Sequence, residues 1–145
     1  MQLIRPLICA MLLLPTAAGA CDIQISTPGT LGLSSDGRTL SSVSGLPTVV
    51  IISDLSLLSP TTITISNIRL TDAPAGFASP VTFSGTYDAT WTLLGQSNGP
   101  ISPTATFSAG PILNLAITIT IHNTVTSANG FKQGTYKTKT TVTCT

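Results

Sequence analysis

Few side chains of this 145-residue sequence are suited to acid–base or metal chemistry. Besides three cysteines, they are one histidine and five aspartates. Glutamate is absent, so paired carboxylates of the kind used in glycoside hydrolysis could come only from aspartate. The aspartates are spread singly through the chain, and we expect them to cap turns and strand ends: Asp22, Asp36, Asp54, Asp72 and Asp88.

The single histidine, His122, lies among threonines in a strongly alternating segment, which favours a solvent-facing position on a strand. A Ser-His-Asp triad would need His122 beside one of many serines and one of the five aspartates, and we expect no nucleophile elbow. One histidine with two cysteines that can be oxidised does not make a zinc site of the usual type. There is also no glycine-rich phosphate loop. We therefore expect no catalytic residues, no metal, no cofactor and no enzymatic activity.

Two of the cysteines are better placed to form a structural disulfide than to take part in catalysis. Cys21 and Cys144 stand near the two ends of the expected mature chain, while Cys9 lies in an apolar N-terminal segment. A disulfide between Cys21 and Cys144 would join the first strand to the last. Closing so long a loop stabilises a domain by about 2–4 kcal/mol.

The first 20 residues have the layout of a secretory signal peptide. One positive charge precedes the apolar run Leu7–Leu14, and Ala18 and Ala20 stand at the positions before cleavage at Cys21. The run is too short to span a bilayer as a helix. A rival reading is a lipoprotein anchored through Cys21, although the leucine usual in a lipoprotein cleavage box is replaced by Ala18. We expect an exported protein, located in the periplasm, on the cell surface or outside the cell, with no transmembrane segment in the mature chain.

The composition indicates an all-β domain. Charged residues make up 8% of the chain and the formal net charge is +1. A near-neutral chain has no bulk attraction for nucleic acid. Threonine, serine and isoleucine dominate, and the β-branched residues favour strands over helices.

Alternation and turn residues predict about eight or nine short strands in one domain over residues 21–145. Cys21–Ser26 alternates like a half-buried strand, Thr48–Ile52 resembles a strand buried on both faces, and Ile112–Val125 has the clearest period of two. The alternation changes phase between Ile65 and Ile68, which indicates a bulge or a change of sheet. This arrangement predicts an immunoglobulin-like or pilin-like antiparallel β-sandwich.

The last strand places Tyr136, Val142 and Cys144 on one face and two lysines on the other. We expect Lys137 and Lys139, with nearby Lys132, to guard an edge strand rather than to bind anions. The segment Gly95–Pro103 has a turn-like composition and predicts an exposed loop.

The ending Asn129-Gly-Phe-Lys-Gln-Gly-Thr-Tyr136, followed by alternating threonine and valine, resembles the final strand of bacterial pilin-type β-sandwiches. Chaperone–usher fimbrial subunits and spore coat protein U-like secreted proteins share that ending. The sequence departs from fimbrial subunits in two ways. Cleavage before Cys21 would leave no N-terminal extension to donate to a neighbour, and the disulfide would join first to last strand. The resemblance therefore implies a pilin-like or coat-like structural domain rather than polymerisation by donated strands.

We expect a non-enzymatic structural or cell-surface protein, a subunit of a fimbria- or coat-like assembly, whose partners are other surface or fimbrial proteins or itself. The alternative is a secreted carbohydrate- or protein-binding module that recognises its ligand through the Gly95–Pro103 loop. For either function we expect Trp91 to lie in the core rather than to stack on a sugar, because it alternates in phase with Ala89 and Leu93.

Overall fold

The protein is described by a computed structural model that covers residues 21–55, 59–91, 95–110 and 116–145. Within those ranges the chain forms antiparallel strands in two sheets and no helix, so no helix there is long and apolar enough to cross a membrane. The predicted signal peptide at residues 1–20 lies outside the described residues. So do Leu93 and the first residues of the strand predicted from Ile112.

The strands of the described ranges follow one another with short connections. In chain order they are β1 (Asp22–Thr27), β2 (Thr30–Leu33), β3 (Thr39–Leu46), β4 (Thr48–Ser53), β5 (Thr61–Asp72), β6 (Val81–Trp91), β7 (Gly95–Ile101), β8 (Thr104–Ala109), β9 (Ile117–Ser127) and β10 (Lys137–Cys144).

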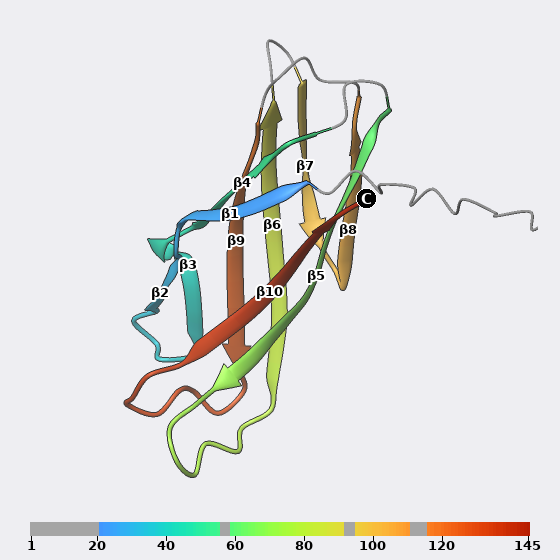
Figure 1. The fold of residues 1–145 in the computed structure, drawn as a ribbon. Coiled ribbons are helices and arrows are strands. Elements are labelled where there is room, and N and C mark those ends of the chain that lie inside the picture. The colour runs from blue at the N-terminus through green and yellow to red at the C-terminus, as the bar shows by residue number, and fades with distance from the viewer. Residues whose placement is uncertain (1–20, 56–58, 92–94, 111–115) are drawn as a thin grey trace, which may run out of the picture.

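Strand β9 is the centre of a seven-stranded sheet. Strand β6 pairs with one side of β9, and β3 and β4 share the other side. Strand β7 lies outside β6, β1 outside β4, and β2 outside β3. The second sheet has the order β10-β5-β8 and lies over the first (Figure 1). The predicted antiparallel sandwich is confirmed.

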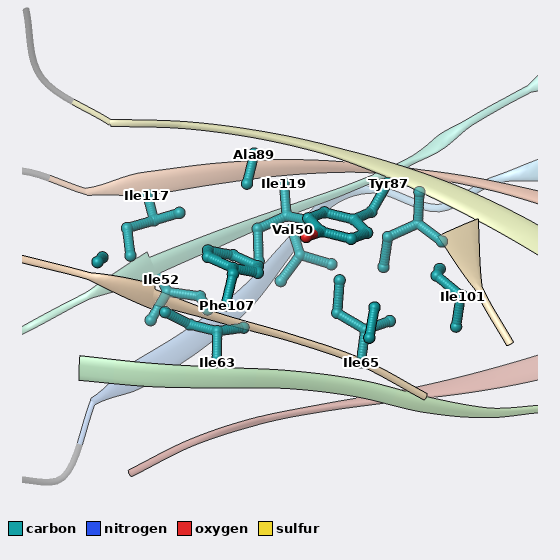
Figure 2. Packing of buried hydrophobic residues seen from close by; sticks show 13 residues of the cluster. Val50, Ile52, Ile63, Ile65, Tyr87, Ala89, Ile101, Phe107, Ile117 and Ile119 are labelled. Atoms are coloured by element: carbon teal, nitrogen blue, oxygen red, sulfur yellow. The ribbon is translucent and has the colours of Figure 1, made fainter. Parts of the chain in front are cut away.

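The core lies between the two sheets, where side chains from six strands interdigitate (Figure 2). Ile63 and Ile65 of β5 face Ile117 and Ile119 of β9, and all four side chains are fully buried. Phe107 of β8 packs between them. These alternating positions explain why the period of two in the sequence identifies the strands, because only one face of each sheet touches the core.

The predicted bulge in β5 is confirmed. Lys139 of β10 pairs with Arg69 and Thr141 pairs with Ser66, so the pairing shifts by one residue between Ser66 and Arg69. The shift lets Ile68 turn towards the core although it is out of phase with Ile65. In β4, Val50 and Ile52 are buried, but their neighbours on the outer face are only half-buried, so the prediction of burial on both faces is only half right.

The prediction of an exposed loop at Gly95–Pro103 is wrong. Residues 95–101 form β7, which pairs with β6 from Gly85↔Ile101 to Trp91↔Gly95. The glycines and Pro100 are tolerated because β7 is paired on one side only among the described strands, and an edge position needs no further backbone donor from proline. This strand raises the count from the predicted eight or nine to ten within the described residues.

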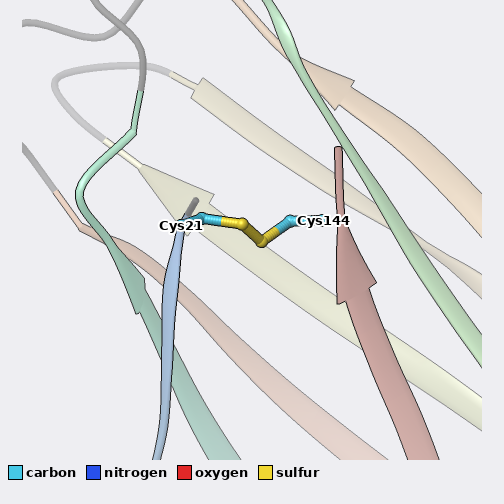
Figure 3. The surroundings of a disulfide bond; sticks show 2 residues. All are labelled: Cys21 and Cys144. Carbon is cyan, nitrogen blue, oxygen red and sulfur yellow. A yellow bond between two sulfur atoms is a disulfide. The ribbon is translucent and has the colours of Figure 1, made fainter. Parts of the chain in front are cut away.

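The predicted disulfide is present and joins Cys21, just before β1, to Cys144 at the end of β10 (Figure 3). It connects an edge of the large sheet to an edge of the small sheet. The sulfur of Cys21 is bonded to that of Cys144, so it is not available to carry a lipid as the lipoprotein reading requires.

Candidate functional site

The outer edges of β1 and β10 face one another across an open groove. The two strands meet at the Cys21–Cys144 disulfide and diverge away from it (Figure 1). Strand β1 pairs only with β4 and β10 only with β5 among the described strands. Each strand therefore turns a row of backbone N–H and C=O groups without a described ladder partner towards the groove. The groove has a volume of about 570 Å³.

Aliphatic side chains line the groove and remain open to solvent. Ile25 is 68% exposed, Leu46 is 56% exposed and Ile23 is 37% exposed, and all three belong to the lining. Deeper lining comes from Val50 and Ile121, which are buried. No aromatic side chain of the described residues belongs to the lining. The prediction that the face of β1 bearing Ile23 and Ile25 would be half-buried is wrong, because no described strand covers it.

A detour of β3 opens the floor of the groove. Strand β3 leaves β9 after Ser41↔Thr124 and the pairing resumes in β4 at Thr48↔Ile121, so residues 42–47 stand opposite residues 122–123. Two glycines allow the close approach of β2 to this detour, since a Cβ on Gly45 would lie 2.2 Å from the carbonyl oxygen of Thr30. The detour also exposes Val43, which does not line the groove.

Polar side chains cross the floor of the groove. The backbone N–H of Asn123 donates to Ser42 Oγ at 3.0 Å, and Asn123 Nδ2 donates to Thr140 Oγ1 at 2.9 Å. Asn123 and Ser42 are both buried. Asn123 thereby ties β9 in the large sheet to β10 in the small sheet. This link holds the inner side of the groove in place while its outer side stays open.

The rim on the β10 side is positively charged. Lys139 pairs across the ladder with Arg69, so two cations lie side by side on the outer face of the small sheet. Neither has an ion pair among the described residues. The neighbouring Lys137 does, since its Nζ lies 3.2 Å from Asp72 Oδ2. The predicted edge position of Lys137 and Lys139 is therefore confirmed. Lys132 lies apart from them and donates to the carbonyl oxygen of Gly76.

The structure brings two of the side chains singled out for chemistry, His122 and Asp88, near each other. His122 lies on the outer face of β9, as expected, with Nε2 at 3.9 Å from Asp88 Oδ2, which is long for a hydrogen bond. Its Nδ1 has no hydrogen-bond partner among the described residues. In that part of the chain no group of three or more histidine, cysteine or acidic side chains is arranged to hold a metal ion.

The aspartates occupy turns and strand ends, apart from Asp88 within β6. Asp36 shows the predicted capping role. Ser34 Oγ and the backbone N–H of Arg38 both donate to Asp36 Oδ1, and these hydrogen bonds, that of Ser34 first, lower the pKa of the Asp36 carboxyl. Asp54 has a positive φ of 57° just after β4.

One pattern in the sequence fits a nucleophile but is used structurally. Gly95-Gln-Ser-Asn-Gly99 has the glycine-x-serine-x-glycine spacing of a hydrolase nucleophile elbow, which requires a sharp strand-to-helix turn. Here the segment is the flat strand β7. Ser97 Oγ lies 2.9 Å from the hydroxyl of Tyr87, on the core side of the sheet, and His122 lies on the opposite face.

Trp91 is not a free platform for a sugar. Its ring is stacked on Phe107 with centroids 5.8 Å apart, and it packs against the core, as predicted. The loop at Gly95–Pro103, through which a binding module was expected to recognise its ligand, is largely replaced by strand β7.

No known protein family, curated protein or solved structure matches this chain. The groove between β1 and β10 is therefore assessed on its geometry alone. It offers two backbone edges, exposed aliphatic side chains at alternate positions and a cationic rim. Sequence reasoning identified β1 and β10 as strands but missed the groove, since alternation reports which face is apolar and not what covers it.

Proposed function

We propose that this protein is an exported, non-enzymatic structural subunit of a fimbria- or coat-like surface assembly, and that it binds an extended β-strand of another polypeptide in the groove between β1 and β10. The observation that carries the proposal is the juxtaposition of two edge strands around a row of exposed aliphatic side chains. An added strand would form backbone hydrogen bonds with the edges and bury the aliphatic row at the same time.

The chemistry of the groove defines the partner strand. Side chains at alternate positions would enter the groove, so we expect them to be aliphatic, like Ile25 and Leu46 which they would contact. The remaining side chains would face solvent beside Lys139 of β10, whose other neighbour is Arg69 of β5. An acidic residue at that position would relieve the like-charge pair, because cross-strand pairs of opposite charge are favourable. A sugar is a poor fit, as the described lining lacks an aromatic surface for stacking.

Several features support the assignment to an exported structural protein. The disulfide fits an oxidising compartment, and residues 1–20 have the composition of a signal peptide. Among the described residues no group of three or more histidine, cysteine or acidic side chains is arranged to hold a catalytic metal ion. Binding a strand requires no N-terminal extension on this chain, so the proposal differs from polymerisation by donated strands. The proposed location of the protein is the periplasm, the cell surface or the medium.

The test uses a synthetic peptide of about seven residues that alternates valine with serine or threonine and has one central glutamate. Its affinity for the purified protein is measured by fluorescence anisotropy. The Ile25→Asp variant should weaken binding at least about tenfold, because burying a charge in place of an aliphatic side chain is unfavourable. Val43→Asp is the matched control, since Val43 is 79% exposed but lies outside the lining.

Equal affinity of the peptide for the protein and for the Ile25→Asp variant would contradict the proposal. A dimer of the peptide-free protein would also contradict the proposal, if analytical ultracentrifugation showed that the Ile25→Asp variant no longer forms it. That outcome would make a second copy of this chain, not a different partner, the occupant of the groove.

A further inference from the structure

We infer that the Cys21–Cys144 disulfide is the end stop of the strand-binding groove, and that the groove accepts the free end of a partner chain rather than an internal segment. This inference rests on the proposed function.

The groove is narrow at the disulfide. The Cα atoms of Cys21 and Cys144 lie 6.5 Å apart. Neighbouring strands in a sheet are about 4.8 Å apart, so a strand inserted between two others needs them about 9.6 Å apart. The backbone of a third strand therefore cannot pass between β1 and β10 at the disulfide. Figure 3 shows the bond spanning the two strand ends directly.

The groove widens away from the disulfide. Strands β1 and β10 separate with distance from the bond, and β1 runs away from it while β10 runs towards it (Figure 1). The groove is thus closed at one end and open at the other. A strand in either direction would make one parallel and one antiparallel ladder, so backbone pairing alone does not select its direction.

The closed end of the groove restricts which part of a partner chain can bind. An internal segment would have to bend out of the sheet before it reached the disulfide, which forfeits backbone hydrogen bonds on both sides. A chain terminus simply ends there. Strand β1 spans six residues, Asp22–Thr27, which at about 3.3 Å per residue gives a ladder of about 20 Å. The paired part of the occupant should be no longer than this ladder.

The closed end would also fix the register of the bound strand. A strand seated against a stop has a fixed register, and a shift of one residue would turn every aliphatic side chain out of the groove. The stop would therefore select partner strands by the distance from their free end to their aliphatic positions. The disulfide would contribute specificity as well as stability.

The experiment compares the peptide described above with two longer versions, one extended by about two alternating residues at its N-terminus and one at its C-terminus. Affinities are measured on the oxidised protein and on the Cys21→Ser/Cys144→Ser double variant. On the oxidised protein, one extension should leave affinity unchanged or raise it, and the other should lower it at least about tenfold. In the double variant that difference should disappear.

Peptides that bind the oxidised protein with equal affinity, whichever end is extended, would overturn the end stop while leaving the proposed function intact. Absence of binding by any peptide would instead overturn the proposed function itself.

If the double variant does not fold, a measurement on the oxidised protein alone still tests the end stop. A nitroxide on the terminus that tolerates no extension should broaden the amide signals of Cys21 and Cys144, and a nitroxide on the opposite terminus should not. Broadening from both termini would contradict the inference.

Discussion

Strands β9 and β1 have the same alternation of isoleucine with polar residues but opposite surroundings. In β9, Ile117, Ile119 and Ile121 are 0–2% exposed, because the small sheet covers them. In β1, Ile23 and Ile25 are 37% and 68% exposed. The difference arises from position in the sheet, since β9 is central and β1 lies at an edge beside the groove. An apolar face without a cover is a candidate surface for a partner.

The contrast extends to the edges of the fold. Strand β7 is also paired on one side among the described strands, but it turns Gln96 and Asn98 to solvent instead of isoleucine. Polar side chains of this kind make an edge a poor template for another strand. The facing edges of β1 and β10 combine backbone groups without described partners and an exposed aliphatic lining.

The largest expected effect is a loss of stability when the covered face of β9 is altered, compared with the uncovered face of β1. Ile119→Ala should lower the free energy of unfolding by about 2–5 kcal/mol, because it removes fully buried methyl groups and leaves a cavity. Ile25→Ala should change it by about 0.5 kcal/mol or less, as its side chain is largely solvated. Urea unfolding followed by circular dichroism measures both. Equal losses would mean that Ile25 is covered in solution.

The next effect concerns the closed end of the groove. The Cys21→Ser/Cys144→Ser double variant should be less stable by about 2–4 kcal/mol, because the disulfide restricts the unfolded chain across a separation of 123 residues. Thermal unfolding under oxidising and reducing conditions gives the same comparison on the unmodified protein. An unchanged melting temperature after reduction would show that the bond does not hold β1 and β10 together.

A smaller effect is expected from the link across the groove floor. Asn123→Ala removes the hydrogen bond to Thr140 and should lower the free energy of unfolding by about 1 kcal/mol or somewhat more, since the side chain is buried. Asn98→Ala on the exposed face of β7 is the matched control and should have little effect. If both substitutions had the same effect, Asn123 would not tie the two sheets together.

The smallest effect tests the cationic rim. Lys139→Glu should weaken binding of the glutamate-containing peptide by up to about fivefold and strengthen binding of a version with lysine in that position, because exposed charge pairs contribute about 0.2–1 kcal/mol. Lys132→Glu, which lies away from the groove lining, should alter neither affinity. A similar loss in both variants would indicate a general charge effect, and the partner would then need no acidic residue beside Lys139.

Much of the fold could be predicted from the sequence because period-two patterns report directly on a sheet that touches the core on one side. The alternation in β9, the bulge before Ile68 and the cysteine pair all led to correct predictions. Strand β7 was missed because its glycines and Pro100 have a turn-like composition, and pairing with β6 overrides that local preference.

The groove could not be predicted for a different reason. Its lining combines Ile25, Leu46 and Asn123, which are far apart in sequence and meet only through the detour of β3 and the divergence of β1 from β10. Nothing local in the sequence distinguishes Ile25 from Ile119, since each has polar neighbours on both sides. Long-range pairing decides which of them is covered.

Amide hydrogen exchange on the protein with and without the alternating peptide tests the central claim most directly. The account predicts that saturating peptide slows exchange of edge amides in β1 and β10 and leaves β7 unchanged, because a strand in the groove supplies the missing ladder on both sides. Bound peptide that protects β7, or that leaves β1 and β10 exchanging at their original rates, would contradict it.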